Sequence, residues 1–329
     1  MVAPGGGLGV PKAPGLLDRR LLFVTGKGGV GKTTVAAALA LGAAQSGKRT
    51  LVCEVDAKGD LADFYETGPL AFEPRTIEAG LDAMTMQTEA SLREYLRLQL
   101  RLPMLVRMGP LARAFDFVAL AAPGVREILT VGKLAYEVRA GHYDLVVVDG
   151  PATGHIVGQL ASPSGIRDLV QVGAIRHQTD WMLDLLHDPA VTGVVVVSAP
   201  EDMPVNETLE LLDRLERQTG VDLAAVVMNR VLPELFSRHQ QEIAASLDTS
   251  GSPALRVLVD AADLATRLRR SRTPHLRRLR TELGARAPLL YVPDLFTRVP
   301  GRRTTRLIAE ALAAELGVVA SGGPGVNGL

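Results

Sequence analysis

The sequence predicts an α/β protein built on a doubly wound parallel sheet, and two observations carry this prediction. Short apolar runs bounded by turn residues alternate along the chain with longer segments whose apolar residues recur every three to four positions. The short runs are typical of buried parallel strands, and the longer segments are typical of helices that cover both faces of the sheet. In a sheet of this kind, ligands bind beyond the carboxyl ends of the strands.

The elements follow in order from these patterns. Apolar runs predict strands at Leu21–Thr25, Thr50–Val55, Asp144–Asp149, Gly193–Ser198, Ala224–Asn229 and Leu289–Val292. Periodic segments predict helices at Thr33–Gln45, Val125–Ala140, Val205–Thr219 and Thr304–Leu316.

Four regions lie outside this alternation. Residues 87–124 and 163–190 show no strand pattern, and we expect them to be helical insertions that form a subdomain above the ligand site. Residues 1–18 and 318–329 are rich in Gly and Pro, and we expect them to be disordered tails. One domain, residues 19–317, remains between the tails.

Composition excludes several classes of protein. Lys and Arg together number 36, as do Asp and Glu, so no global charge favours nucleic acid or membrane surfaces. The single cysteine, Cys53, excludes an internal disulfide or a Cys-based zinc site within one chain, and its apolar surroundings predict a buried, inert thiol. We see neither a signal peptide nor a run of roughly 20 apolar residues that could span a membrane. We therefore expect a soluble, cytoplasmic protein.

The stretch TGKGGVGKTT, Thr25–Thr34, carries the strongest motif. It follows a predicted strand and opens a predicted helix, which is the context that the phosphate-binding pattern GxxxxGK[ST] requires. Glycines let backbone N–H groups face phosphate oxygens, and the helix N-terminus adds its dipole. Lys32 would bridge the β- and γ-phosphates, and the Thr33 hydroxyl would ligate Mg²⁺. The predicted nucleotide contacts are Gly26, Gly28, Gly29, Val30, Gly31, Lys32, Thr33 and Thr34.

Polar side chains end three other predicted strands. Asp149 fits the acid that supports Mg²⁺ in nucleotide triphosphatases, although Asp also ends strands as a turn former. The loop DGPATGH that begins at Asp149 is rich in Gly and Thr and could sense phosphate. Asp56 could orient the attacking water or cap the following helix. Asn229 could read an adenine edge or cap a turn.

Together these motifs resemble one family. GKGGVGKTT is similar to the deviant P-loop of the MinD/ParA-like ATPases, and DGPATGH is similar to the DTAPTGH switch of its ArsA-like branch, the arsenite-pump and tail-anchored-protein-targeting ATPases. The resemblance continues through PEDMPVNET at Pro200–Thr208, VVMNR at Val226–Arg230 and YVPDLF at Tyr291–Phe296. It covers nearly the whole chain between the tails.

The resemblance implies a dimer that sandwiches ATP and Mg²⁺ at its interface. By it, Lys27 is the signature lysine that contacts phosphates bound by the partner subunit, and Asp56 is the hydrolytic aspartate. Asn229 and Pro293 fall on base-binding positions. His155, in the second switch, would relay the nucleotide state.

Departures from the family pattern bear on hydrolysis. In the first switch, DAKGDLAD stands for DPAHNLSD, so that Gly59 replaces His and Asp60 replaces an Asn that helps to polarise water. In the second switch, Ala152 stands where Pro is usual, and Gly158 stands where an Arg is usual. We therefore expect nucleotide binding with slow hydrolysis. The arsenite-binding cysteines and the zinc-binding CxxC of the two sub-families are missing.

Two further stretches each allow two interpretations. Glu94–Phe115 is rich in Leu, Met and Arg; a helix that packs on the domain is favoured over an apolar client groove, because Pro103 and Pro110 break a long helix. Arg267–Arg280 holds seven arginines, and a solvated helix face is favoured over a nucleic-acid or membrane surface.

The sequence thus predicts a Mg²⁺- and ATP-dependent dimeric ATPase that switches the conformation of a helical subdomain. It would be a homo-dimer or a hetero-dimer with a paralogous ATPase, its client a hydrophobic segment or a membrane protein. The alternative is a weakly hydrolysing regulatory subunit of such a hetero-dimer. A DNA-positioning ATPase would need Arg267–Arg280 to bind DNA, and no nucleic-acid partner is expected.

Overall fold

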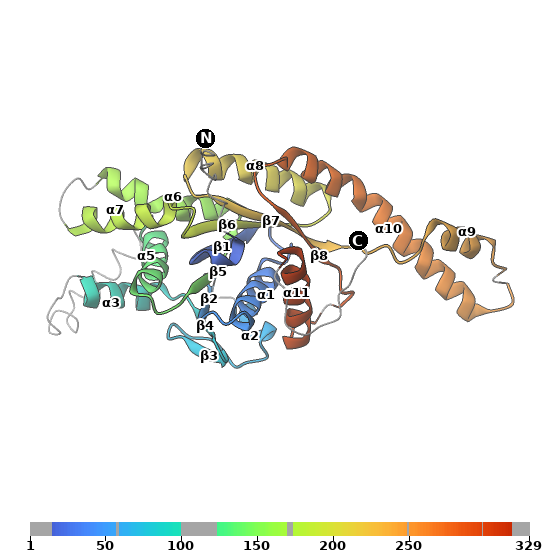
Figure 1. The fold of residues 1–329 in the computed structure, drawn as a ribbon, viewed down its shortest axis with the longest axis horizontal. Coiled ribbons are helices and arrows are strands. Elements are labelled where there is room, and N and C mark those ends of the chain that lie inside the picture. The colour runs from blue at the N-terminus through green and yellow to red at the C-terminus, as the bar shows by residue number, and fades with distance from the viewer. Residues whose placement is uncertain are drawn as a thin grey trace, which may run out of the picture.

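The computed structural model describes residues 15–56, 59–99, 124–169, 174–248, 250–297 and 299–317, with the side chains of residues 95–99 and 174–175 excepted. Within these residues, eight strands form one sheet in the order β3-β4-β2-β5-β1-β6-β7-β8 (Figure 1). Their bounds are β1 Leu21–Gly26, β2 Thr50–Glu54, β3 Arg75–Glu78, β4 Leu81–Thr85, β5 Leu145–Ala152, β6 Thr192–Ser198, β7 Leu223–Val231 and β8 Leu289–Pro293. Neighbouring strands are parallel except β3 with β4, so the predicted fold class is confirmed.

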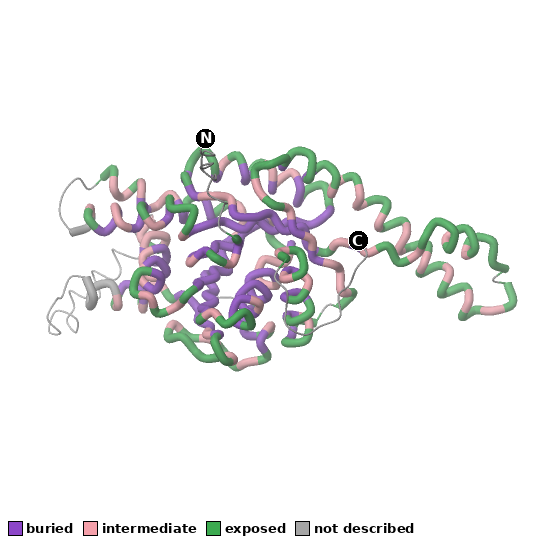
Figure 2. Tube along the Cα trace, in the orientation of Figure 1, coloured by how far each residue is buried: buried purple, intermediate pink, exposed green. Residues whose placement is uncertain are grey.

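Helices cover both faces of the sheet and enclose two apolar cores. Their bounds are α1 Lys32–Gln45, α2 Asp60–Phe64, α3 Thr88–Gln99, α5 Val125–Ala140, α6 Thr153–Leu169, α7 Ala174–His187, α8 Asp202–Gln218, α9 Arg238–Ser246, α10 Pro253–Leu283 and α11 Arg302–Glu315. One core lies under α1, α2 and α11, and the other under α5, α6, α8 and the end of α10. Figure 2 shows buried residues concentrated in the sheet and in the helix faces against it.

The central strands carry unbroken apolar runs because both of their faces are covered. In β5, Leu145 and Val147 belong to one core, and Val146 and Val148 belong to the other. This follows from the two-residue period of a strand, and it explains why the sequence shows an unbroken apolar run instead of an alternation.

All six predicted strands and all four predicted helices are present, with ends that differ by three residues at most. The hairpin β3–β4 was not predicted. Its first strand is half or fully exposed, and Asp82 interrupts the apolar run of the second. The Asp82 carboxylate accepts a hydrogen bond from the Tyr143 hydroxyl at 2.9 Å, a partner that local sequence cannot show.

The expected insertions are described in part. The described residues of 87–124 and 163–190 include α3, the end of α6, and α7, while residues 100–123 lie outside the description. Helices α3, α5, α6 and α7 gather at one end of the molecule (Figure 1). Of the stretch Glu94–Phe115, the Glu94 side chain is described, and it accepts a hydrogen bond from Lys133 of α5 at 2.9 Å.

Several smaller expectations can be compared with the structure. Leu16–Asp18, at the end of the expected amino-terminal tail, forms a 3-10 helix with Leu16 buried. Cys53 is fully buried, and this burial raises the pKa of its thiol, as suits an inert residue. No helix among the described residues is long and apolar enough to cross a membrane.

The arginines of Arg267–Arg280 mostly contact the protein itself. Arg269 donates to the Leu232 carbonyl, Arg270 donates to Gln241 at 2.9 Å, and Arg278 donates to Asn206 at 2.6 Å. Arg267 pairs with Asp263 at 3.1 Å, and Arg272 lies 3.7 Å from Glu201. These contacts fit the expected helix face.

Candidate nucleotide-binding site

The phosphate-binding loop lies between the carboxyl end of β1 and the first turn of α1. A Cβ at Gly26 would lie 2.1 Å from the Val197 carbonyl oxygen, and a Cβ at Gly31 would lie 2.2 Å from the Asn229 amide nitrogen. Gly31 also has a φ of 97°, which disfavours other residues. Around Gly28 and Gly29, by contrast, a Cβ would meet no described atom within 4 Å. The loop is therefore packed at its two ends and open in the middle.

This open middle suits an anion. Gly31 caps α1 and has no side chain that could accept from the first N–H groups of the helix. These groups and the helix dipole can therefore serve phosphate oxygens. Val30 is buried and anchors the loop to the core, while Thr34 lies in the first turn of α1.

The two lysines of the loop differ in their surroundings. Lys32 lies at the start of α1, and its ammonium group is 3.4 Å from the Lys27 carbonyl oxygen, across the loop. Lys27 instead donates to Glu207 Oε1 of α8 at 2.5 Å. The other oxygen of Glu207 is 3.5 Å from the Thr153 hydroxyl in the DGPATGH loop. One carboxylate of α8 thus contacts both loops, a contact that we did not predict.

Asp149 lies beside the loop on the neighbouring strand. Its Cα is in register with Val24 of β1 and Glu54 of β2. The carboxyl group is buried, its Oδ1 has no hydrogen-bond partner among the described residues, and Thr33 bonds to the same carboxyl. Burial raises the pKa of Asp149 to about 7, against the Thr33 bond and the Lys32 charge, which lower it.

These features fit Mg²⁺, which prefers oxygen ligands and often keeps waters between itself and protein carboxylates. A cation held by the Thr33 hydroxyl would satisfy the buried Asp149 oxygen directly or through one of its waters. It would also offset the negative charge of Glu54 and Asp60, which raises the pKa of Asp149 further.

Asp149→Asn should stabilise the metal-free protein at neutral pH. The folded wild type keeps the Asp149 proton up to about pH 7, whereas the unfolded chain loses it near pH 4, so this group lowers stability progressively between these two values. Thermal unfolding in a chelator measures the effect, and the gain in melting temperature should be larger at pH 8 than at pH 5. Asp144, whose pKa Arg49 lowers to about 2, is the control. Asp144→Asn should change the melting temperature by the same amount at pH 5 and at pH 8. Equal gains in melting temperature at pH 5 and pH 8 for Asp149→Asn would contradict the raised pKa of Asp149.

The first switch is held by a residue that we did not predict. Glu54 ends β2, is buried, and accepts from the Thr85 hydroxyl at 3.1 Å and from the Asp60 backbone N–H at 3.0 Å. Asp56, the predicted hydrolytic residue, is 44% exposed, and its carboxylate lies 3.9 Å from the Arg126 guanidinium of α5. The switch therefore begins with one buried and one half-buried carboxylate.

Asn229 supports the loop from behind. It is buried, donates to the Val30 carbonyl oxygen at 2.8 Å, and accepts from the Arg230 backbone N–H at 2.9 Å. Its contacts are thus with the phosphate-binding loop and its own strand end. Pro293, the other predicted base contact, ends β8 in register with Val231.

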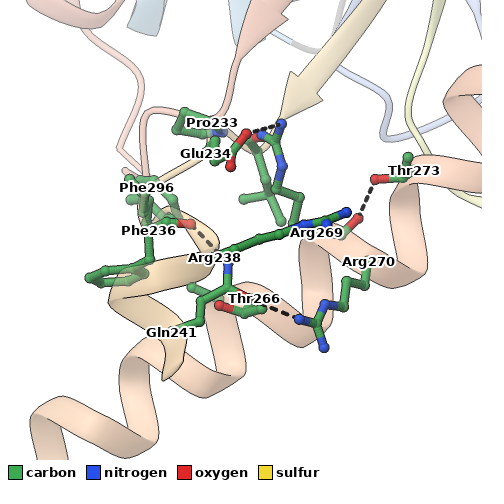
Figure 3. Close-up of a pocket in the computed structure, with 13 residues that line it drawn as sticks. Pro233, Glu234, Phe236, Arg238, Gln241, Thr266, Arg269, Arg270, Thr273 and Phe296 are labelled. Carbon is green, nitrogen blue, oxygen red and sulfur yellow. Dashed lines mark hydrogen bonds and ion pairs between the residues drawn. The ribbon is translucent and has the colours of Figure 1, made fainter. Parts of the chain in front are cut away.

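A pocket of about 160 Å³ opens beyond these two strand ends (Figure 3). It is lined by the loop after β7, by α9 and α10, and by Phe296, and neither Asn229 nor Pro293 lines it. Inside it, Arg270 donates to Gln241, and Arg269 lies 3.6 Å from Glu234. The pocket is therefore beside the predicted base site and separate from it. His155, the predicted relay, is exposed in the first turn of α6.

A parallel sheet with this loop between β1 and α1 and a buried acid on the neighbouring strand defines the chain as a P-loop nucleoside triphosphatase. The model of the anion-transporting ATPase family matches residues 19–183 and 168–246, and the chain belongs to that family. The predicted ArsA-like resemblance is thereby confirmed, and ATPase activity is the activity of this family.

Curated relatives agree with the family. The chain is 32% identical to ATPase BagA of Mycobacterium tuberculosis over 295 residues, which cover 84% of this chain and 86% of the relative. It is 26% identical to ATPase GET3 of Chaetomium globosum over 262 residues, which cover 68% of this chain and 76% of the relative.

Proposed function

We propose that this protein binds Mg-ATP at the P-loop and hydrolyses it to ADP and phosphate in a dimer whose site is completed by the facing subunit. The observation that carries the proposal is the pair formed by Thr33, in the first turn of α1, and Asp149, in β5. There, a buried carboxylate oxygen without a described partner lies beside a hydroxyl, where the backbone N–H groups can bind phosphate.

Different residues of the site would bind different parts of Mg-ATP. Backbone N–H groups from Gly28 to Thr34 hold the phosphates, and the Lys32 ammonium neutralises the outer ones. Thr33, with Asp149 behind it, would hold Mg²⁺, which supplies charge neutralisation at the transferred phosphoryl group. Asn229 and Val30 fix the shape of the loop, so that it is organised before ATP binds.

Lys27 would act on the nucleotide of the facing subunit. In the single chain its ammonium group is held by Glu207, and the two side chains are 25% and 33% exposed. A partly exposed ion pair of this kind is worth about 1 kcal/mol or less. Phosphates of a facing nucleotide, with several negative charges, would therefore outcompete Glu207. Because Glu207 also contacts Thr153, its release from Lys27 would change the contacts of the second switch.

Hydrolysis would be slow. Asp56, which would orient the attacking water, faces Arg126, and the altered switch residues Gly59 and Asp60 follow it. A switch that must first release Asp56 from an arginine gives a reason for a low rate. The switching element would be the helical subdomain of residues 87–124 and 163–190. The client would be a hydrophobic segment or a membrane protein.

The second candidate is a regulatory subunit that holds ATP and hydrolyses it weakly, paired with a paralogous ATPase. The Asp56–Arg126 contact and the altered first switch favour it. Steady-state phosphate release, measured with and without Mg²⁺ and with and without the paralogue, separates the two. We expect release by the protein alone that requires Mg²⁺. Release only in the mixture would favour the regulatory subunit, and no ATP binding under any condition would reject both.

A further inference from the structure

Helix α9 and the first part of α10 form an arm that projects from the sheet (Figure 1). We define the arm as residues 238–248 and 250–271. Neither α9 nor this part of α10 contains a buried residue, since the buried residues of α10 are Leu279 and Leu283 near its end. Figure 2 accordingly shows the arm as exposed and half-buried throughout. The arm is held in shape by side-chain caps at Ser237 and Ser252.

The part of α10 in the arm has two distinct faces. One face is half-buried on the side of α9, where Arg270 donates to Gln241 of α9 at 2.9 Å. Its half-buried residues are Leu255, Val259, Ala262, Ala265, Thr266 and Arg269. On the opposite face lies a stripe of exposed residues: Ala254, Val257, Ala261, Leu264 and Leu268. Val257 is 67% exposed, Leu264 52% and Leu268 41%.

The spacing of the stripe is that of a coiled-coil seam. Its steps along the chain are three, four, three and four residues, the heptad pattern with which two helices pack together. Exposed leucines placed singly need no explanation, but an ordered apolar stripe on a projecting helix does.

We infer that this stripe pairs with the same stripe of a second copy, with the two α10 helices antiparallel. Seam residues then meet as large against small: Leu264 faces the partner's Ala261, and Leu268 faces the partner's Val257. On one flank Asp260 faces the partner's Arg267, and the two-fold axis repeats this contact.

The flanking charges select this arrangement. Asp260 and Arg267 are seven residues apart, so they lie on the same flank of the stripe with opposite signs, and only antiparallel copies bring them together. A parallel pair would instead set Arg267 against the partner's Arg272, which is repulsive. An apolar segment of another protein would offer Asp260 no opposite charge, which is why a second copy is favoured. Arg267, which lies 3.1 Å from Asp263 of its own chain, would contact both Asp263 and the partner's Asp260.

The pairing should be weak and independent of ATP. Two helices that meet over about four turns bury less than roughly 1,200 Å², the lower limit of a standard interface, so a concentration-dependent dimer is expected. The stripe contains no residue of the nucleotide site. An experiment without nucleotide therefore tests the pairing of the arms and leaves the proposed ATP-dependent dimer untouched.

Sedimentation equilibrium of the full chain without nucleotide tests the pairing. The wild type should dimerise with rising concentration, and Asp260→Arg should raise the dissociation constant at least about tenfold, because it places two arginine pairs in contact. The double variant Asp260→Arg with Arg267→Asp should restore dimerisation to within about threefold of wild type. Glu242→Arg, which places the same charge change on α9, on the other side of α10 from the stripe, is the matched control and should leave the dissociation constant nearly unchanged.

Cross-linking tests the register. In a Cys53→Ala background, a mixture of Ala261→Cys and Leu264→Cys chains should cross-link through a short bismaleimide to a higher yield than either chain alone, because the two residues face each other across the antiparallel seam. A monomer at all concentrations, a dimer insensitive to Asp260→Arg, or equal cross-linking yields would overturn the inference.

Discussion

Lys32→Ala should abolish the thermal stabilisation of this protein by Mg-ATP while leaving the fold intact. A ligand that binds only the folded state stabilises it by about 2.7 kcal/mol at a hundred times its dissociation constant, so the wild type should gain several degrees in melting temperature. The Lys32 side chain crosses the open loop, and its ammonium group lies 3.4 Å from the Lys27 carbonyl oxygen. A phosphate bound in the loop would therefore lie next to this ammonium group. Its removal takes away the main compensating charge at the site and no part of the apolar core.

The matched control is Lys48→Ala. Lys48 lies at the other end of α1, and its ammonium group contacts the Leu17 carbonyl and Asp18. This variant should lose some stability yet keep the full shift with Mg-ATP, measured by differential scanning fluorimetry. A full shift in Lys32→Ala would remove the P-loop assignment.

Lys27→Ala should leave ATP affinity nearly unchanged and depress hydrolysis strongly. In the single chain Lys27 is turned toward Glu207, with its ammonium group 2.5 Å from the carboxylate, so it contributes little to binding its own nucleotide. A cation supplied to a transferring phosphoryl group by a facing subunit is worth on the order of 10³–10⁵ in rate. Equilibrium nucleotide binding and steady-state phosphate release, measured on the same preparation, separate the two effects.

Glu207→Gln is the comparison that isolates the lysine charge. Lys27→Ala removes both the charge and the Lys27–Glu207 ion pair, whereas Glu207→Gln removes the ion pair and keeps the lysine. If the ion pair merely holds Lys27 until phosphate displaces Glu207, Glu207→Gln should retain hydrolysis to within a few-fold of wild type. A loss as large as that of Lys27→Ala would show that the ion pair itself is needed, and that Lys27 acts within its own chain.

The parts of the site that could be predicted are those in which the chemistry is local. The P-loop is a continuous stretch, and its glycines are required by contacts and backbone angles that any strand–loop–helix of this kind repeats. Asp149 could be predicted because it directly follows an apolar run. The central strands were found for the same reason, since burial on both faces leaves unbroken apolar runs.

The parts that could not be predicted depend on contacts between distant residues. Lys27 and Glu207 are 180 positions apart, and Asn229 bonds to a carbonyl 199 positions away, so no local pattern reveals either contact. Glu54 looks like the end of an apolar run until its bonds to Thr85 and Asp60 are seen. In α10 the sequence shows the seven arginines, but it does not show that the apolar stripe before them is exposed on a projecting helix.

In the proposed dimer, each nucleotide site uses Lys32 of its own chain and Lys27 of the facing chain. Phosphate release from a one-to-one mixture of Lys27→Ala and Lys32→Ala chains tests it most directly. In the mixed dimer one site regains both lysines, so we expect activity well above that of either variant alone, rising as the two chains are mixed. If this protein pairs with a paralogue, the two variants are made in opposite members of that pair. Activity in the mixture equal to the mean of the separate variants would contradict the shared site, because two lysines acting in the same chain cannot be restored by mixing.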